Sequence, residues 1–371
     1  MSADSPARDL VFVAHSGQAS GAEKVMLGLV DLALSRGHRV RVACPDGPLS
    51  ALLPAAVERV PIPELGLTGQ RGGRRLLAAT TMARHWVRAA RVFRALSRRD
   101  RAQIIVNSTM ALPAVALARP RRGSTVWLVH DILASRRQVL VAKAGRRAVG
   151  RAVAVSERAA DPVRQLGFDV RVARQGVPWP VEPVPVRERA PVVVGILGVI
   201  TEWKGHHVLL DAVAQVPEIA LEIAGAAHPG DEPYLDALRE RSQRTNLAGR
   251  VRFLGRVDAM TTLRDWDILV SASVLPEAGP LVVLEAMSLG VAVVATDHGG
   301  NVTADTALCV PADDPSALRA ALRRLADDPA LRAQLRAAGR THVATHHDRS
   351  HTEPRMLNLL VGEAHPVRFG Y

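Results

Sequence analysis

The chain of 371 residues contains little cysteine, lysine or aromatic side chain. Its 2 cysteines, Cys44 and Cys309, lie in different predicted domains, which argues against a disulfide framework and favours a reducing cytoplasm. No apolar run approaches about 18 residues, so no membrane-spanning helix is expected. The N-terminus also lacks a charged-then-apolar signal pattern. We therefore expect a cytoplasmic protein.

The charge is strongly positive, with a formal net value of +12. This balance raises nucleic acid or an anionic membrane as partners. However, among the 48 basic residues only Lys24, Lys143 and Lys204 are lysines, and the arginine- and alanine-rich usage is typical of GC-rich genomes such as those of actinobacteria. Aromatic residues for base stacking amount to 3%, the arginines are dispersed and no recognition motif is present. We expect no nucleic-acid partner.

Short aliphatic runs alternate with helical patterns along both halves of the chain. The runs occupy 10–14, 39–44, 103–108, 125–130 and 152–156 in the first half, and 192–198, 221–225, 251–255, 268–273, 291–296 and 307–311 in the second. Continuous apolar strands separated by helices are typical of a parallel sheet covered on both faces. Between the halves, VPWPVEPVPVRERAP (177–191) is rich in proline and predicts a semi-rigid extended hinge.

The predicted fold class is therefore α/β, with two doubly wound, Rossmann-like parallel-sheet domains facing a cleft. We assign residues 1–176 to an N-terminal domain, 177–191 to the hinge and 192–346 to a C-terminal domain. The tail, 347–371, is expected to cross back to the N-terminal domain. Ligands of such sheets bind beyond the carboxyl ends of the strands, so the site is expected in the cleft.

Three features at strand ends are candidates for binding an anion or a polar ligand. The turn SGQASGAEK (16–24) opens a helix whose free N–H groups suit a phosphate, although its spacing fits neither the dinucleotide fingerprint nor a P-loop, and a plain flexible turn is the alternative. Lys204 follows the first strand of the second domain; we favour phosphate binding over a solvated lysine, because the chain uses arginine almost everywhere else. His130 closes an apolar strand, and we favour a functional ring over a core histidine.

The stretch PEAGPLVVLEAMSLG (276–290) places two glutamates inside an apolar segment. Pro280 is well suited to the first position of a helix, so Glu277 lies in the preceding loop and Glu285 within the helix. A buried carboxylate needs partners, and sugar hydroxyls are donors that match it. The helix N-terminus between the glutamates suits a phosphate.

Asp265 and Asp267, in RDWDILV, look like a metal-binding DxD motif. They lie at the N-terminal edge of a predicted strand, which is the wrong end for a ligand. We therefore interpret Asp267 as a structural cap rather than as a metal ligand.

These motifs together resemble the retaining glycosyltransferases of family 4, which have the GT-B fold. The resemblance spans nearly the whole chain. Its strongest part is Glu277 and Glu285 as the E-x7-E motif with EAMSLGVAVVATDHGGN (285–301) following; WKGHHVLLDAVA (203–214), SGAEKVMLGLVDLALSRGHRVRV (20–42) and RQGVP (174–178) add to it.

The resemblance implies a retaining transfer of a sugar from a nucleoside-diphosphate sugar, with a UDP-sugar favoured, to a hydroxyl of a small-molecule, glycan or lipid-linked acceptor. It implies roles for seven residues: Glu285 binds the ribose, Glu277 binds the transferred sugar, Lys204 with the backbone at Gly279 and Leu281 binds the diphosphate, Gly21 lets its loop close on the ligand, and His130 orients the sugar. Apart from the resemblance, Arg256 at another strand end of the same domain is a candidate for a further source of positive charge. No metal or other cofactor is expected, because Lys204 and the helix dipole offset the charge.

The sequence departs from the family pattern at two positions. Val199 stands where the family usually has an arginine that binds the phosphates with the lysine. Pro280, which has no N–H to donate, stands where the family has a glycine. Each departure removes one expected contact to the diphosphate. Three readings therefore remain: a transferase, a GT-B epimerase or phosphorolytic enzyme, and a donor-binding scaffold without turnover.

The segment 82–96 has the pattern of an amphipathic helix. Its apolar face is formed by Met82, Trp86, Ala89, Val92, Phe93 and Leu96, and its basic face by Arg84, Arg88, Arg91, Arg94 and Arg98. A helix that covers the core with a solvated arginine face is the simpler interpretation. Peripheral contact with the inner face of an anionic membrane through Arg84, Arg88, Arg91 and Arg98 is the alternative.

Overall fold

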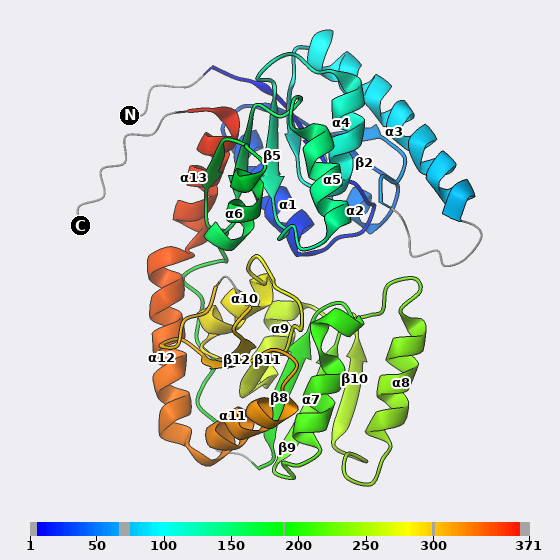
Figure 1. The fold of residues 1–371 in the computed structure, drawn as a ribbon. Helices are drawn as coiled ribbons and strands as arrows, with labels where there is room; N and C mark the ends of the chain where they lie inside the picture. Colours follow the sequence, from blue (N-terminus) through cyan, green and yellow to red (C-terminus); the bar gives the residue numbers. More distant parts are fainter. Residues whose placement is uncertain (1–5, 67–74, 188–189, 299–300, 364–371) are drawn as a thin grey trace. The chain divides into compact units, whose positions relative to one another are not determined.

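A computed structural model of the chain describes residues 6–66, 75–187, 190–298 and 301–363. The chain divides into two compact units, Met1–Gln175 with His351–Tyr371 and Gly176–Ser350 (Figure 1). Each unit is built on one parallel sheet with helical connections between its strands. The prediction of two doubly wound domains is therefore confirmed.

The sheet of the first unit has the strand order β3-β2-β1-β4-β5-β6-β7. Its strands are β1 (Asp9–Val13), β2 (Arg39–Cys44), β3 (Glu58–Pro61), β4 (Gln103–Val106), β5 (Thr125–Val129), β6 (Arg151–Ala154) and β7 (Val170–Val172). Its helices are α1 (Gly21–Ser35), α2 (Pro48–Ala51), α3 (Arg75–Arg98), α4 (Leu112–Ala118), α5 (Arg136–Gly145) and α6 (Glu157–Gln165). The strand order reverses between β1 and β4, and ligands of such sheets bind at this switch point.

Helix α13 (Arg349–Val361) returns the end of the chain to the first unit from His351 onward (Figure 1). The Gln103 amide donates a hydrogen bond to the Leu360 carbonyl at 2.6 Å, and the Arg36 guanidinium donates to Asn358 Oδ1 at 2.6 Å. Met356 and Leu357 of this helix are buried. The helix is thus an integral layer of the first unit.

The sheet of the second unit has the strand order β10-β9-β8-β11-β12-β13. Its strands are β8 (Val192–Leu197), β9 (Ile219–Ala224), β10 (Val251–Gly255), β11 (Ile268–Ser271), β12 (Ala292–Thr296) and β13 (Leu308–Val310). Its helices are α7 (His206–Val213), α8 (Glu232–Ser242), α9 (Ala259–Thr262), α10 (Leu281–Leu289), α11 (Pro315–Asp327) and α12 (Pro329–His346). The first and last residues of the unit are neighbours, since the Val177 N–H donates to the His347 carbonyl at 2.9 Å and the Arg349 N–H donates to the Val177 carbonyl at 3.0 Å.

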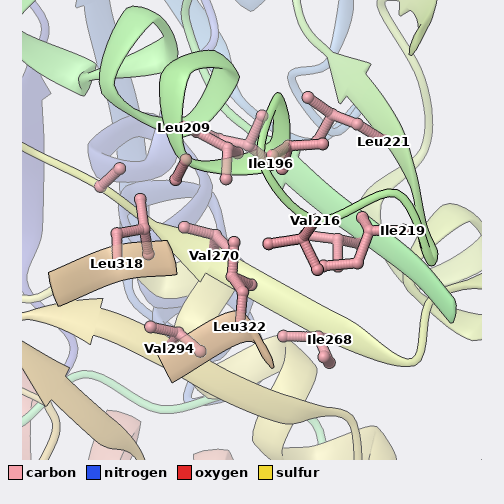
Figure 2. Close-up of a cluster of buried hydrophobic side chains, with 14 of the residues drawn as sticks. Ile196, Leu209, Val216, Ile219, Leu221, Ile268, Val270, Val294, Leu318 and Leu322 are labelled. Carbon is pink, nitrogen blue, oxygen red and sulfur yellow. The ribbon is translucent and has the colours of Figure 1, made fainter. Parts of the chain in front are cut away.

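The core of the second unit explains why its strands are almost continuously apolar. On one face, Ile196, Val270 and Val294 of the sheet pack with Leu209, Leu318 and Leu322 of α7 and α11 (Figure 2). On the other face, Leu269 and Val293 pack with residues of α10 and α12. A parallel sheet buried on both faces requires apolar residues at successive positions.

Gly195 in β8 lies directly against the ring of Trp266. A Cβ atom at this position would lie 2.0 Å from the indole, which is itself only 1% exposed. The Trp266 Nε1–H donates to Glu222 Oε2 at 2.8 Å, so the ring is held in place from its polar end as well. Close packing of this kind leaves no room for a residue larger than glycine at position 195 of β8.

The proline-rich stretch after Gly176 is attached to the second unit. The Val184 N–H donates to the Leu289 carbonyl at 2.8 Å, and the Arg340 guanidinium donates to the Val181 carbonyl at 3.2 Å. The same guanidinium lies 4.6 Å from the ring centroid of Trp179. The contacts of this stretch run along α10 and α12.

Candidate functional site

The carboxyl ends of β8, β11 and β12 bring the candidate residues of the second unit together. Lys204 ends a short 3-10 helix, Glu202–Lys204, that follows β8, while Glu277 lies in the loop between β11 and α10. Because these strands are parallel neighbours, their C-terminal loops meet at one edge of the sheet.

Lys204 and Glu277 form an ion pair, with Nζ 2.6 Å from Oε2. Their side chains are 18% and 12% exposed, so the pair is largely shielded from water. The other carboxylate oxygen accepts a hydrogen bond from the Ser273 hydroxyl. The Lys204 ammonium also lies over the Trp203 ring, 4.5 Å from its centroid. The two residues expected to bind phosphate and sugar therefore contact each other directly.

Backbone contacts fix the loops that carry this pair. The Glu277 N–H donates to the His298 carbonyl at 3.2 Å, and the Thr296 hydroxyl donates to the Ser273 carbonyl at 2.9 Å. Gly205 has a φ of 70°, and a Cβ atom there would lie 2.0 Å from the Ala272 carbonyl oxygen. The β8 and β11 loops approach so closely at this point that only glycine fits.

Helix α10 begins one residue later than the sequence suggests. Pro280 is the residue before the helix, with φ −67° and ψ 124°, and Leu281 is the first helical residue. The expectation that Pro280 opens the helix is therefore wrong, because its extended ψ keeps it outside the helical turn. Gly279 has a φ of 153°, and a Cβ there would lie 2.7 Å from Asn301 Oδ1. The first N–H groups of a helix have no partner within it, so this end of α10 can receive an anion.

Glu285 lies within α10 and is 9% exposed, so the carboxylate expected to bind ribose is largely covered by protein. Arg256 follows β10, which is separated from β8 by β9. Adjacent strands are about 4.8 Å apart, so the two loops start about 10 Å from each other. Arg256 is exposed and is not part of the Lys204–Glu277 network.

Asp267 has a structural contact, as its place before β11 indicates. Its Oδ2 accepts a hydrogen bond from the Val193 N–H at 2.8 Å. Asp265 is paired with Arg187 at 3.7 Å instead of sharing a site with Asp267. Among the described residues, no group of acidic, histidine or cysteine side chains is arranged to hold a metal ion.

In the first unit, His130 follows β5 and pairs with Asn107, which follows β4. His130 Nε2 lies 2.8 Å from Asn107 Oδ1, and Asn107 Nδ2 donates to the Ala22 carbonyl at 3.3 Å. Burial lowers the pKa of His130 to about 4, so the ring is neutral at pH 7. Because Asn107 presents its oxygen, Nε2 carries the proton and Nδ1 is left as a hydrogen-bond acceptor. Gly21, the first residue of α1, precedes Ala22 in the same turn.

Sequence reasoning missed Ser273 and Asn107. Both are polar residues at the ends of predicted apolar strands, in the runs ILVSAS and QIIVNS. Because the carboxyl ends of parallel strands form ligand sites, a polar residue closing such a run was the available signal.

The face formed by α3, α4 and α5 is basic and partly apolar. The six apolar residues predicted to share one face of α3 are buried or half-buried, and the five arginines of the other face are exposed, so the predicted amphipathic helix is confirmed. Arg94 donates to the carbonyls of Leu117 and Ala118, and Arg98 donates to that of Arg119. These two arginines therefore bind the C-terminal end of α4.

A groove of about 600 Å³ lies on the same face. It is lined by Trp86, Arg94, Pro113, Ala116, Leu117, Arg119 and Ala144. On the same three helices, the apolar residues Val87, Leu117 and Leu140 are 42%, 46% and 67% exposed. The sequences of the three helices contain no aspartate or glutamate. No helix within the described residues is both long enough and apolar enough to span a bilayer.

Two sequence profiles match the chain. The profile of glycosyltransferase family 4 covers residues 19–178, and that of glycosyl transferases group 1 covers residues 184–342. The phosphatidyl-myo-inositol mannosyltransferase of Mycolicibacterium smegmatis is 40% identical over 152 residues, which are 38% of this chain and 37% of that protein. The D-inositol 3-phosphate glycosyltransferase of Jonesia denitrificans is 33% identical over 166 residues, 41% of this chain and 38% of that protein. The chain thus spans less than half the length of these curated relatives.

Solved structures share the fold over nearly the whole chain. HepE of Anabaena, in complex with UDP-glucose, has a TM-score of 0.78 at 21% identity and covers 95% of this chain and 99% of its own. Sucrose-phosphate synthase from Thermosynechococcus elongatus has a TM-score of 0.79 at 20% identity and covers 96% and 98%. The predicted GT-B architecture is confirmed.

Proposed function

Because the chain belongs to glycosyltransferase family 4, we propose that it transfers a sugar from a nucleoside-diphosphate sugar to a hydroxyl group of an acceptor. The observation that carries this proposal is the shielded Lys204–Glu277 pair, whose lysine follows β8 and whose glutamate lies in the loop before helix α10. This edge of the sheet offers an ammonium, a carboxylate and free helix N–H groups to one ligand. A nucleotide-sugar presents the matching phosphates and hydroxyls.

Within this proposal each residue has a defined contact. Lys204 and the first N–H groups of α10, next to Gly279 and Leu281, bind the diphosphate. Glu277 accepts hydrogen bonds from the sugar hydroxyls, and Glu285 accepts them from the ribose. Arg256 adds positive charge at a greater distance.

We assign the acceptor to the first unit, which also contributes His130 and Gly21. The neutral His130 ring accepts a hydrogen bond from the transferred sugar at Nδ1, because Asn107 engages its other nitrogen. Gly21 lets the β1–α1 loop approach the ligand without a side chain in the way.

The transfer proceeds with retention of configuration. The bond between the anomeric carbon and the diphosphate oxygen breaks, and the acceptor oxygen attacks from the same face. A departing phosphate oxygen takes the acceptor proton, so charge and protons balance. The chain stabilises the leaving diphosphate and holds the two reactants together without a metal ion, through Lys204 and the α10 dipole.

Thermal denaturation of the full chain with UDP, GDP and their sugars tests this function. One relative, from Corynebacterium glutamicum, is a GDP-mannose-dependent mannosyltransferase, and HepE was solved with UDP-glucose; we favour UDP. A ligand at 100 times its dissociation constant adds about 2.7 kcal/mol to the free energy of unfolding. We expect this shift with one nucleotide series and none with inorganic diphosphate at the same concentration.

A denaturation temperature unchanged by every nucleotide would contradict the proposal. If the ligand binds, nucleotide release that rises with added sugar or polyol acceptors supports transfer. Turnover of the donor with no acceptor present would instead indicate an epimerase, and binding without any turnover would indicate a scaffold.

We also propose that the α3–α4–α5 face contacts an anionic membrane where the acceptor is a lipid. Three observations support this contact. The three helices contain no aspartate or glutamate, the apolar residues Val87, Leu117 and Leu140 are exposed, and the groove lies on the same face. Arg84, Arg88 and Arg91 are exposed and face outward from α3, whereas Arg98 also holds the end of α4. Apolar side chains flanked by arginines are typical of proteins that lie on a lipid surface.

Replacing Arg84, Arg88 and Arg91 together by glutamate is expected to lower the affinity for phosphatidylglycerol vesicles by about 100-fold, since each basic residue near an anionic surface contributes about 1 kcal/mol. Vesicle sedimentation at low salt measures this. The same charge reversal at Arg239, Arg244 and Arg324, exposed arginines of the second unit, is the control and should change binding far less. Equal sedimentation with neutral vesicles would contradict the proposal.

A further inference from the structure

The Lys204–Glu277 pair raises a question about the order of events at the site. Lys204 is the ammonium that would bind a diphosphate, yet in this structure it donates to a carboxylate at 2.6 Å. Ser273 holds the second oxygen of this carboxylate, and the Glu277 N–H is bonded to the His298 carbonyl. The carboxylate is therefore fixed from its backbone and from one oxygen, which leaves Oε2 directed at Lys204.

A carboxylate and a diphosphate are both anions, so they compete for the same ammonium group. A nucleoside diphosphate that takes Lys204 leaves Glu277 without its cation and close to the negative phosphates. In a site this shielded from water, an unpaired carboxylate is unfavourable. Binding of the diphosphate alone is therefore opposed by Glu277.

A nucleotide-sugar brings hydroxyl donors together with its phosphates. As Lys204 turns to the diphosphate, the sugar hydroxyls donate to Glu277 Oε2 and take the place of the ammonium. Every charged group then has a partner, and the penalty that opposes the bare diphosphate disappears.

We propose that Glu277 makes the binding of a diphosphate by Lys204 dependent on the attached sugar, and that Ser273 is the positioning residue that keeps Glu277 in this role. The proposal rests on the function proposed above. Before transfer, the sugar satisfies Glu277 and the donor is held. After transfer, the hydroxyls leave with the product, Glu277 binds Lys204 again, and the nucleoside diphosphate is released.

Trp203 keeps Lys204 near both of its partners. The ammonium lies over the indole face, 4.5 Å from the ring centroid, and the Trp203 carbonyl accepts a hydrogen bond from the Val274 N–H at 2.8 Å. A cation over an aromatic face is stabilised without being neutralised. Lys204 can therefore exchange the carboxylate for a phosphate oxygen with little movement of its loop.

A double-mutant cycle on the full chain tests the coupling. The binding of UDP and GDP, and of the corresponding nucleotide-sugars, is measured by calorimetry for the wild type, Glu277→Gln, Lys204→Met and the double variant. We expect Glu277→Gln to bind the nucleoside diphosphate about tenfold more tightly, because coupling between close, shielded charges is of this order or larger. It should bind the nucleotide-sugar no more tightly than the wild type does.

If the Lys204–Glu277 pair causes the tighter binding of the nucleoside diphosphate by Glu277→Gln, this gain in affinity requires Lys204. In the Lys204→Met background, Glu277→Gln is expected to change the affinity for the nucleoside diphosphate less than twofold. Glu240→Gln, which removes one negative charge at an exposed position near the end of α8, is the matched control and should leave both affinities unchanged. A tenfold gain from Glu240→Gln, or in the lysine-free background, would show a general charge effect and overturn the proposal.

Ser273→Ala is expected to weaken the preference for the nucleotide-sugar over the nucleoside diphosphate by about threefold, since one hydrogen bond is removed. Ser273→Thr keeps the hydroxyl and should restore the preference. A purely structural serine would alter the denaturation temperature without altering this ratio of affinities.

Failure of this inference can be distinguished from failure of the proposed function. If the wild type binds nucleotides and Glu277→Gln binds the nucleoside diphosphate no more tightly, the coupling is absent and the transferase proposal stands. If neither the wild type nor any variant binds a nucleotide or nucleotide-sugar, the proposed function is wrong and this inference falls with it.

Discussion

Replacing Lys204 by methionine is expected to lower kcat/KM for sugar transfer by about 100- to 1,000-fold, the loss typical of removing one group that stabilises a leaving anion. Methionine has nearly the same length and fills the same space over Trp203, but it cannot neutralise the departing diphosphate. Steady-state transfer with saturating acceptor measures this effect.

The lysine at position 143 provides the control for Lys204→Met. Lys143 is exposed on α5 of the first unit, whereas Lys204 and Glu277 lie in loops of the second unit. Lys143→Met should therefore leave donor binding unchanged. A Lys204→Met variant that retained more than a tenth of the wild-type kcat/KM would show that another cation binds the diphosphate. Arg256 would then be the first residue to replace.

Gly195→Ala is expected to lower the free energy of unfolding of the second unit by about 3 kcal/mol, at the upper end of what one inserted carbon costs in a packed core. The new Cβ would lie 2.0 Å from the Trp266 indole, so either the ring or strand β8 must move. Neither moves easily, because Trp266 is bonded to Glu222 and β8 pairs with β9 on one side and β11 on the other. Urea denaturation followed by tryptophan fluorescence measures the change.

Gly249→Ala is the comparison for Gly195→Ala. Gly249 has a φ of 75° with nothing within 4 Å of the added Cβ, so alanine there meets only backbone strain of about 1 kcal/mol. Equal destabilisation by the two substitutions would contradict the account of the Trp266 contact.

Most of the fold was predictable from the sequence, because a strand of a sheet that is buried on both faces has an almost continuous apolar run. The long apolar runs became central strands, and β2 and β10 were predicted with the bounds that the structure gives them. Strands β3 (ERVP) and β7 (VRV) were missed, since each is short, lies at an edge of the sheet and mixes charged with apolar residues. Edge strands have one partner and need no continuous apolar run.

The candidate site was only partly predictable. Lys204 and Glu277 were identified by type and by position at strand ends, but each was assigned to a different part of the donor. Their direct contact joins residues 73 positions apart and depends on the order of β8 and β11 in the sheet. Asn107 escaped notice for the same reason, because its hydrogen bonds to His130 and Ala22 join separate loops and leave no periodicity in the sequence. Ser273 lies in the same loop as Glu277, and its polar side chain at the end of a predicted strand was overlooked.

The pairing of Val177 with His347 and Arg349 gives the second unit the character of a cassette. The chain enters and leaves it through neighbouring residues, so two cuts separate the second unit from the first without interrupting a strand or the sheet order. An exchange of residues 176–350 with the equivalent segment of another family member would transfer the whole Lys204–Glu277–Ser273 network at once. Diversification in such a protein can therefore proceed by replacing one unit. Under the proposed function, the choice of sugar nucleotide would then be inherited separately from the choice of acceptor.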